Sequence, residues 1–495
     1  MPRIVPFLAL VVLTACQASP TSTPAPTERP PALDAIREDE IKADLYALAG
    51  DHFRGREAGT LDELKASAWL AERARAAGLA PAGDDGTYFQ FWPMRRIRVA
   101  ASTTVRAGAR DFPLHREAVI LSQAAAVVDA PLVDGGDIRS VGGVDIDGKA
   151  VIIQITKPAA NLPPDISVRP ARYLFAAATE TVSALAKAKP AAIILVSDAV
   201  ADSGWQFVST WFRNGSYGLE FGETVLGPRT ATPVIWVKQA ARAALVPGER
   251  LRATLAFDRF TYPSVNVVAK VEGSDPARRG QYVLYSAHQD HDGVKEPVAG
   301  DSIWNGADDN GSVSVGILAI GRALARRPAP RSALFVWHGA EEKGLIGSRY
   351  YAQHPTVPKD SIVAVLNADM IGANHPDTAA LLGVQPPHLN SPDLVAFGFR
   401  ANAMVAGFVV DTLWDRPSHV EGWYFRSDHV PYATAGIPSL YFSSLPHPVY
   451  HTQLDEPARI NYPKLTRIAK WMYATGWLVA TAPERVRALP RPGAR

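Results

Sequence analysis

Several acidic and histidine side chains in the second half of the chain stand at or just after short apolar runs. The members of this set are His288, Asp290, Asp308, Glu341, Glu342, Asp369 and His451. Oxygen and nitrogen donors in this combination suit zinc better than calcium, which takes oxygen ligands. So many carboxylates in one place would repel one another unless cations share them. The set therefore predicts a centre with two metal ions joined by a bridging carboxylate.

Residues 305–312 read NGADDNGS and place Asp308 and Asp309 side by side. Asn, Asp and Gly are common turn formers, so a solvated turn is the alternative to a metal site. The other metal-ligand types in the chain favour the metal site. We assign a metal-binding role to Asp308 and expect Asp309 to form part of the turn that directs it.

Alternating strands and helices from about residue 264 onward would position these side chains. Strands are predicted over 264–273, 281–290, 332–342, 361–370 and 437–444, and a buried helix over 310–327. Such alternation predicts a mixed, mostly parallel sheet sandwiched by helices, an α/β fold. Ligands gather beyond the carboxyl ends of such strands. A strand end directly positions every member of the set except Asp308 and His451.

The rest of the chain divides by pattern into further segments. Apolar residues at steps of three and four predict helices over 39–50 and 60–78, within an N-terminal catalytic segment, 39–99. Short β-like runs separated by Gly and Pro, at 149–155, 191–198 and 231–237, mark 100–255 as an inserted β-rich domain. The catalytic domain resumes over 256–482, and 483–495 is expected to be a flexible tail.

The N-terminus has the features of an export signal. Arg3 precedes a short apolar run, too short for the roughly 20 residues that span a bilayer. The run ends in LTAC, and Cys16 is the only cysteine in the chain. We expect 1–15 to be a lipoprotein signal peptide, with cleavage at a nearby small residue as the alternative. Residues 16–38, rich in Pro, Ser and Thr, read as a disordered tether.

These features place the protein at the periplasmic face of a bacterial membrane, most simply the outer membrane, or outside the cell. Lipidation of Cys16 would hold it there. Stable anchoring needs more than one acyl chain, and a lipidated N-terminal cysteine carries thioether-linked and amide-linked chains together. The 495 residues carry a net charge of only +2, and no Lys- and Arg-rich run predicts a nucleic-acid partner. The sequence does not give the oligomeric state.

The motifs HQD, NGADDNGS, AEEKGLIGS, NADM and YHT, in this order, carry a family resemblance. They resemble the dinuclear zinc aminopeptidase family, which includes bacterial leucine aminopeptidases and glutamate carboxypeptidase II. The resemblance covers roughly 39–99 and 260–480 and implies the zinc-exopeptidase fold, which is phosphorylase/hydrolase-like. The segment between them resembles the protease-associated (PA) domain that many members carry as an insertion.

The resemblance implies a role for each member of the set. One zinc would bind His288 and Asp369, the other would bind Glu342 and His451, and Asp308 would bridge both. Asp290 would hold the His288 ring by a hydrogen bond, and Glu341 would be the general base. Tyr450 would donate to the oxyanion, with a packed core tyrosine as the equal alternative. The family also implies a cis peptide between Asp308 and Asp309.

The implied activity is zinc-dependent removal of N-terminal residues from peptides. The sequence leaves open a carboxypeptidase or dipeptidase of the same fold, and a receptor-like lipoprotein without catalysis. His291 falls past a strand end, and we expect an exposed loop histidine there. His338, inside a strand, is expected to be packed and hydrogen-bonded. The segment His52–Thr60 also resembles the family and is assigned a structural role.

Overall fold

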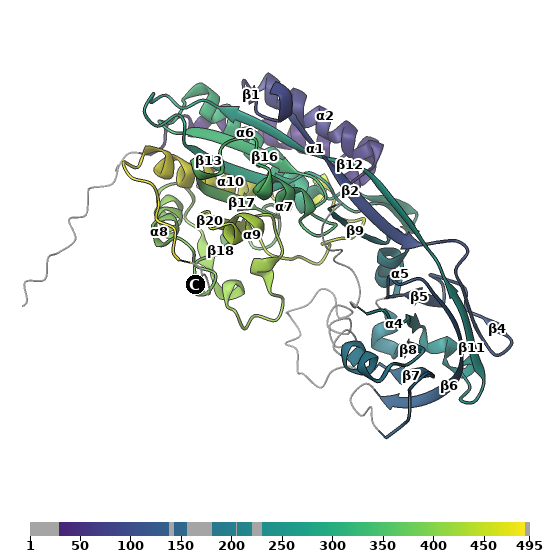
Figure 1. The fold of residues 1–495 in the computed structure, drawn as a ribbon. Coiled ribbons are helices and arrows are strands. Elements are labelled where there is room, and N and C mark those ends of the chain that lie inside the picture. The colour runs from purple at the N-terminus through teal and green to yellow at the C-terminus, as the bar shows by residue number, and fades with distance from the viewer. Residues whose placement is uncertain (1–28, 138–142, 156–180, 204, 220–229, 491–495) are drawn as a thin grey trace, which may run out of the picture.

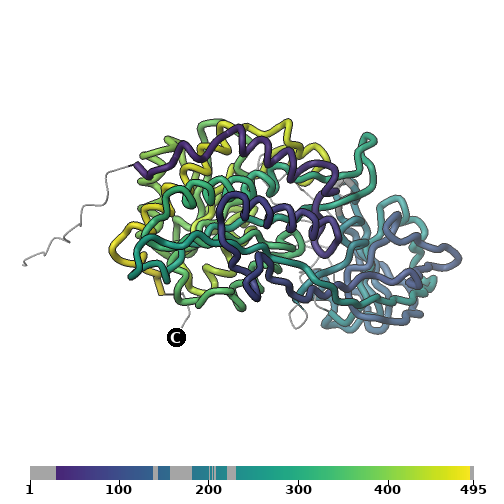
Figure 2. Tube along the Cα trace, turned by 90° about the horizontal axis from the view of Figure 1, so that it is seen from above, coloured from purple at the N-terminus to yellow at the C-terminus, as the bar shows by residue number. Residues whose placement is uncertain are grey.

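The computed structural model describes residues 29–137, 143–155, 181–203, 205–219 and 230–490. The predicted signal peptide, Cys16 and most of the tether lie outside these ranges. Figures 1 and 2 show two lobes, the smaller one formed by the segment around 100–255. Each lobe is built on its own sheet, one of ten strands and one of eight among the described residues.

The larger sheet carries the strands that were predicted to position the site. In spatial order they are β19 (Val409–Asp411), β18 (Thr378–Leu382), β20 (Ser439–Ser443), β17 (Ile362–Ala368), β13 (Tyr282–His288), β16 (Ser332–His338), β12 (Phe257–Val271), β2 (Phe89–Val99) and β9 (Ser216–Leu219), with β1 (Ala80–Pro81) paired to β12. The four strands β20, β17, β13 and β16 run parallel at the centre, and β12, β2 and β9 are antiparallel. The sheet is therefore mixed with a parallel centre.

Helices cover both faces of this sheet, as Figure 1 shows. On one face lie α1 (Glu38–Leu48), α2 (Leu61–Ala76), α6 (Val313–Arg326), α8 (Pro392–Ala401) and α10 (Tyr462–Thr481), and on the other lie α7 (Ile346–Gln353) and α9 (His429–Thr434). Successive residues of a strand point to opposite faces. On β13, Tyr285 packs into the core of the first group, while Leu284 packs into the core of the second. The α/β fold predicted from the sequence is confirmed.

The N-terminal helices form for the reasons that the sequence gives. Ile41, Leu45 and Leu48 are buried along one face of α1. The Thr60 side chain caps α2 by accepting a hydrogen bond from the backbone N–H of Glu63. The 11-residue strand β2, which follows them, was not predicted. Its arginine-rich sequence lacks a clean alternation, and pairing with β12 over its whole length stabilises it.

The smaller sheet has the order β4 (Arg110–Asp111), β3 (Thr104–Ala107), β11 (Arg250–Leu255), β6 (Ala126–Asp137), β7 (Ala150–Gln154), β8 (Ala192–Val196), β10 (Val234–Val237) and β5 (Ala118–Ile120). All these strands fall within 100–255. The helices α4 (Ala199–Ser203) and α5 (Trp205–Asn214) belong to the same segment. One strand of the segment, β9, does not join this sheet but extends the larger one by pairing with β2. The insertion therefore contributes an edge strand to the catalytic lobe.

Residues near the end of the chain contact the larger lobe. Val486 is buried, and Arg487 forms an ion pair with Asp393 at 2.7 Å. The other residues of 483–490 are exposed, and the flexible tail over 483–495 stays a prediction. No helix in the described ranges has the length and apolar character needed to cross a membrane.

Candidate metal centre

The carboxyl ends of the central strands bring the predicted ligands together. His288 is the last residue of β13, and it lies opposite His338, the last residue of β16. Asp369 directly follows β17, the other parallel neighbour of β13. Because parallel strands end at the same edge of a sheet, their terminal side chains meet there. Glu341 follows β16 after a two-residue turn and reaches the same edge, with Oε2 3.8 Å from His288 Nε2.

Asp309 is the carboxylate at the middle of this cluster. Its Oδ1 lies 3.2 Å from His288 Nε2, and its Oδ2 lies 2.9 Å from His451 Nε2. The same His451 nitrogen lies 3.2 Å from Glu342 Oε1. One side chain thus connects the two histidines predicted to hold different metal ions. This is the geometry expected of a bridging ligand, and it contradicts the assignment of that role to Asp308.

Asp308 points away from the two histidines. Its Oδ1 accepts a hydrogen bond of 2.7 Å from the backbone N–H of Gly372, and its Oδ2 lies 3.3 Å from His447 Nε2. The cis peptide also lies one residue later than predicted, between Asp309 and Asn310. Neighbouring residues in an irregular turn point in different directions. A turn-forming sequence alone therefore does not show which of two adjacent acids faces the site.

The donor atoms form overlapping groups that could each hold a metal ion. The groups are His288, Asp309 and Asp369; His291, Asp309 and Glu342; and Asp292, Glu342 and His451, with the donor atoms of each group within 4.8 Å of one another. His288 Nε2, Asp369 Oδ1 and Glu342 Oε1 are buried without a hydrogen-bond partner. Buried polar atoms almost always have partners, so these atoms fit metal ligation. Histidine nitrogens and carboxylate oxygens are donors that suit zinc, which usually takes a small set of such ligands in a tetrahedral arrangement.

His291 belongs to this cluster, contrary to the prediction of an exposed loop histidine. It is fully buried, and its Nδ1 lies 2.9 Å from Glu342 Oε1. The main chain of His291 forms a β-bridge with Glu57 from the N-terminal segment. That contact, made across more than 230 residues of sequence, buries the loop. The sequence signal that could have identified His291 as a candidate ligand was its close spacing to His288.

Further carboxylates hold the ligands in place. The Asp290 carboxylate accepts hydrogen bonds from the backbone N–H groups of Glu341 (3.0 Å) and Glu342 (3.3 Å). The His288 Nδ1 contacts the backbone carbonyl of Asp290 at 3.0 Å, whereas the carboxylate is 3.8 Å away. The Asp290 side chain therefore fixes the glutamate turn, and its main chain orients the histidine. Asp292, which the sequence did not single out, lies 3.0 Å from Nδ1 of His451.

The site is buried and rich in negative charge. Burial raises the pKa of Glu342 to about 8, and burial likewise raises the pKa of Glu341, with Asp369 and Glu342 adding to the effect. Burial opposes ionisation of Asp309 too, but the close contacts with the His288 and His451 rings bring its pKa well below the usual range. Carboxylates with a raised pKa, such as Glu341 and Glu342, are destabilised as anions unless cations share them. The electrostatics therefore agree with the donor geometry.

Tyr450 lies at the edge of the cluster. Its ring meets the His451 ring edge-on at 4.2 Å, and its hydroxyl accepts a hydrogen bond of 3.0 Å from Arg426. Arg426 also forms an ion pair of 3.1 Å with Glu421 and lies over the Trp423 ring. The tyrosine is half-buried and packs against a buried cluster that includes Trp423 and Tyr441. Its hydroxyl is therefore held by a charged partner near the ligands.

Two further histidines, His338 and His429, have structural surroundings. His338 is buried, and its Nε2 lies 3.1 Å from the hydroxyl of Tyr432 on α9, as expected for a packed and hydrogen-bonded residue. His429 is buried between aromatic rings and stacks on Tyr441 at 4.7 Å. Neither belongs to a group of candidate ligands among the described residues.

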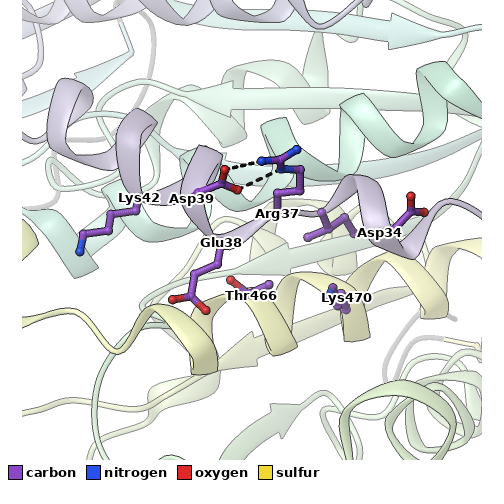
Figure 3. A pocket seen from close by; sticks show the side chains of 8 residues that line it. Asp34, Arg37, Glu38, Asp39, Lys42, Thr466 and Lys470 are labelled. Atoms are coloured by element: carbon purple, nitrogen blue, oxygen red, sulfur yellow. Dashed lines mark hydrogen bonds and ion pairs between the residues drawn. The ribbon is translucent and has the colours of Figure 1, made fainter.

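A cavity of about 590 Å³ lies apart from the cluster, between the N-terminal residues and α10 (Figure 3). Its lining residues are Asp34, Ile36, Arg37, Glu38, Asp39, Lys42, Thr466 and Lys470. The Arg37 and Asp39 side chains pair with each other along its edge. None of the predicted site residues lines it, so its mixed charges do not bear on the chemistry of the cluster.

Comparisons with known proteins find a peptidase family and several aminopeptidases. Residues 266–476 match the model of peptidase family M28. Leucine aminopeptidase 1 of Trichophyton rubrum is 28% identical over 279 residues, which is 52% of this chain and 68% of that protein. Aminopeptidase YwaD of Bacillus subtilis is 28% identical over 250 residues, covering 48% of this chain and only 50% of the relative.

Solved structures match over nearly the whole chain. BSAP, a zinc aminopeptidase from Bacillus subtilis, has a TM-score of 0.58 at 19% identity and covers 89% of this chain and 94% of its own. The aminopeptidase from Aneurinibacillus sp. strain AM-1 has a TM-score of 0.59 at 18% identity, covering 93% and 98%. At these identities the structural matches establish the α/β fold alone.

Proposed function

Residues 266–476 of this chain belong to peptidase family M28, and we propose on that premise that the protein is a zinc aminopeptidase that uses two metal ions. The protein is a metallopeptidase, since its curated relatives are aminopeptidases and its fold is that of a zinc aminopeptidase. Peptides are the substrates that follow from this class. The two-ion centre and the role of each residue are the parts that we propose.

The position of Asp309 carries the proposal. A single buried carboxylate lies within 3.2 Å of two histidine nitrogens, one on His288 and one on His451. Asp369 would complete the ligand set on the His288 side, and Glu342 would complete it on the His451 side. One ion would need only part of this set. Four ligand side chains around one shared carboxylate fit two ions.

Glu341 is the proton-transfer group in this arrangement. Zinc, when bound, polarises the scissile carbonyl and lowers the pKa of the attacking water. Glu341 lies beside His288 without being needed as a ligand, and its main chain is fixed by the Asp290 carboxylate. It accepts the proton of the water and then donates it to the leaving amine. Tyr450, whose hydroxyl accepts a hydrogen bond from Arg426, would donate its own proton in a hydrogen bond to the oxyanion.

The test is hydrolysis of aminoacyl-p-nitroanilides by protein loaded with a known amount of zinc. Glu341→Gln is expected to lower kcat by about 10²–10⁴-fold while the zinc content stays unchanged. Glu272→Gln is the matched control, because Glu272 is an exposed acid whose ion pair is with Arg279, away from the ligands. Full activity of Glu341→Gln would sink the assigned role of this residue.

The same assay separates the alternative functions. An aminopeptidase cleaves peptides with a free N-terminus and leaves N-blocked peptides intact, whereas a carboxypeptidase of this fold needs a free C-terminus and also cleaves N-blocked peptides. A receptor-like lipoprotein cleaves neither, even when it holds zinc. Cleavage of N-blocked peptides that have a free C-terminus would replace the aminopeptidase proposal with the carboxypeptidase one.

We further propose that the protein is exported and anchored by lipid at Cys16. The apolar run followed by LTAC supports this, as does the use of the only cysteine in the chain at that junction. The assignment of the inserted segment as a PA domain also stays a prediction. Cys16→Ala is expected to move the protein from the membrane fraction to the soluble fraction. An unchanged membrane fraction would contradict lipid anchoring.

A further inference from the structure

Arg56 is a buried arginine whose guanidinium binds main-chain carbonyls. Only 1% of the residue is exposed. It donates hydrogen bonds to the carbonyl oxygens of Gln289 (2.7 Å), Asn305 (2.7 Å), Gly306 (2.9 Å) and Leu48 (3.1 Å). The Arg56 backbone has a φ of 52°, a left-handed conformation that a non-glycine residue adopts only when its surroundings enforce it. The residue is therefore strongly constrained.

The carbonyls that Arg56 binds belong to the segments that carry the bridging site. Gln289 stands between His288 and Asp290, and Gly306 comes three residues before Asp309. These two segments pair beyond this point, in β14 (Gly293–Val298) and β15 (Asp301–Trp304), with Gly293 opposite Trp304. The guanidinium joins them on the side of the ligands, where it helps to fix their spacing. Burial lowers the pKa of Arg56 to about 10. This value is still well above 7, so the guanidinium is charged at neutral pH. A charge taken out of water needs such a set of acceptors.

The next residue, Glu57, reaches a third segment. Its Oε1 lies 3.2 Å from Lys343 Nζ, and Lys343 directly follows Glu341 and Glu342. The Lys343 side chain is 8% exposed, and its ammonium lies 5.2 Å from the centre of the Tyr217 ring on β9. A buried ammonium without its carboxylate is costly, so this contact constrains the glutamate turn. The inserted segment, through Tyr217, also covers the Lys343 ammonium.

We propose that Arg56 and Glu57 are positioning residues that set the spacing of the three ligand-bearing segments and thereby the affinity of the site for zinc. This inference rests on the proposed function, because it takes the cluster to be the zinc site. Arg56 acts on the segments of His288 and Asp309, and Glu57 acts on the segment of Glu342 through Lys343. The two residues touch neither metal nor substrate.

The expected effect is a loss of zinc affinity larger than any loss of folding stability. Partners that orient metal ligands typically change affinity by about 10–100-fold when they are removed. Arg56→Lys keeps the charge but replaces a planar fork of five donors with a single ammonium, which cannot bind four carbonyls at these positions. Glu57→Gln keeps the shape and removes the charge that faces Lys343.

Arg331 provides the matched control. It is 2% exposed and likewise donates to main-chain carbonyls, of Val479 and Ala482, at the far end of α10. Arg331→Lys therefore removes the same type of buried clamp from a place away from the ligands. It is expected to lower the melting temperature while zinc affinity and kcat/KM stay as in the wild type.

The experiment measures zinc affinity by competition with a chromophoric chelator, beside thermal unfolding of the metal-free proteins. We expect Arg56→Lys and Glu57→Gln to bind zinc about 10–100-fold more weakly than the wild type, and Arg331→Lys to bind it normally. If Arg56→Lys does not fold, Glu57→Gln decides. Wild-type affinity in the folded Arg56 or Glu57 variants overturns the inference, as does an equal loss in Arg331→Lys. A wild type that binds no zinc overturns the proposed function and this inference with it.

Discussion

Two substitutions one residue apart separate the bridging ligand from its neighbour. Asp309→Asn removes the charge between His288 and His451, and Asp308→Asn removes a charge that faces Gly372 and His447. Both changes keep the size of the side chain. Any difference between them therefore reports which carboxylate the metal ions share.

The expected difference is large. A pair of unit charges 4 Å apart interacts by about 4 kcal/mol at an effective dielectric constant of about 20, and a bridging carboxylate faces two doubly charged ions. Its loss should cost at least about 4 kcal/mol, or roughly a thousandfold in zinc affinity. Asn at position 308 still offers an oxygen to the Gly372 N–H. Losing the remaining contact with His447 should cost about 1 kcal/mol of stability.

Chelator competition and kcat/KM at saturating zinc measure both variants. Asp309→Asn is expected to lose tight zinc binding and activity, and Asp308→Asn to retain zinc affinity within about tenfold, which corresponds to about 1.4 kcal/mol. The reasoning is refuted if the order is reversed, or if the two variants lose zinc equally while both remain folded.

Three further predictions follow from the outer contacts and the burial of charge. Asp292→Asn should weaken zinc binding by about 10–100-fold, because Asp292 orients His451; unchanged zinc affinity would contradict this. Burial raises the pKa of Glu63 from 4.5 to about 8, so the folded protein holds a proton there that the unfolded chain has lost, and stability should fall as pH rises through that window. Glu63→Gln should flatten this part of the urea-unfolding profile between pH 5 and pH 8, and an unchanged slope would count against it. Chelation should lower the melting temperature of the wild type, since zinc at about 100 times its Kd adds about 2.7 kcal/mol per site, and Asp309→Asn should show no such shift.

The strand ends could be predicted because the sequence marks them twice. The apolar runs of β13, β16 and β17 are continuous, as expected of strands buried on both faces. Each run then ends abruptly in acidic or histidine residues. A potential ligand that comes directly after a buried central strand has to lie at the carboxyl edge of the sheet. His288, Glu342 and Asp369 were therefore placed at the correct edge of the sheet.

The loops could not be predicted from the same signals. His291 follows a strand end and looks exposed, but Arg56 and Glu57 from the N-terminal segment cover its loop. Tyr217 lies in the inserted segment, yet it reaches Lys343 because β9 pairs with β2. These contacts join residues that are far apart in sequence. Local composition and periodicity carry no information about them.

The adjacent acids 308 and 309 show how such a loop divides its tasks. The Asp455 carboxylate accepts hydrogen bonds from the backbone N–H groups of both residues, at 2.9 and 3.0 Å, which fixes the turn. Asp308 then accepts from Gly372, three residues beyond Asp369, and so ties the turn to the end of β17. Only Asp309 is left to face the histidines. Position 308 thus needs one acceptor oxygen, which an amide also supplies. Position 309 needs a charge with two oxygens. The two positions should therefore tolerate different substitutions, even though the sequence presents them as equivalent.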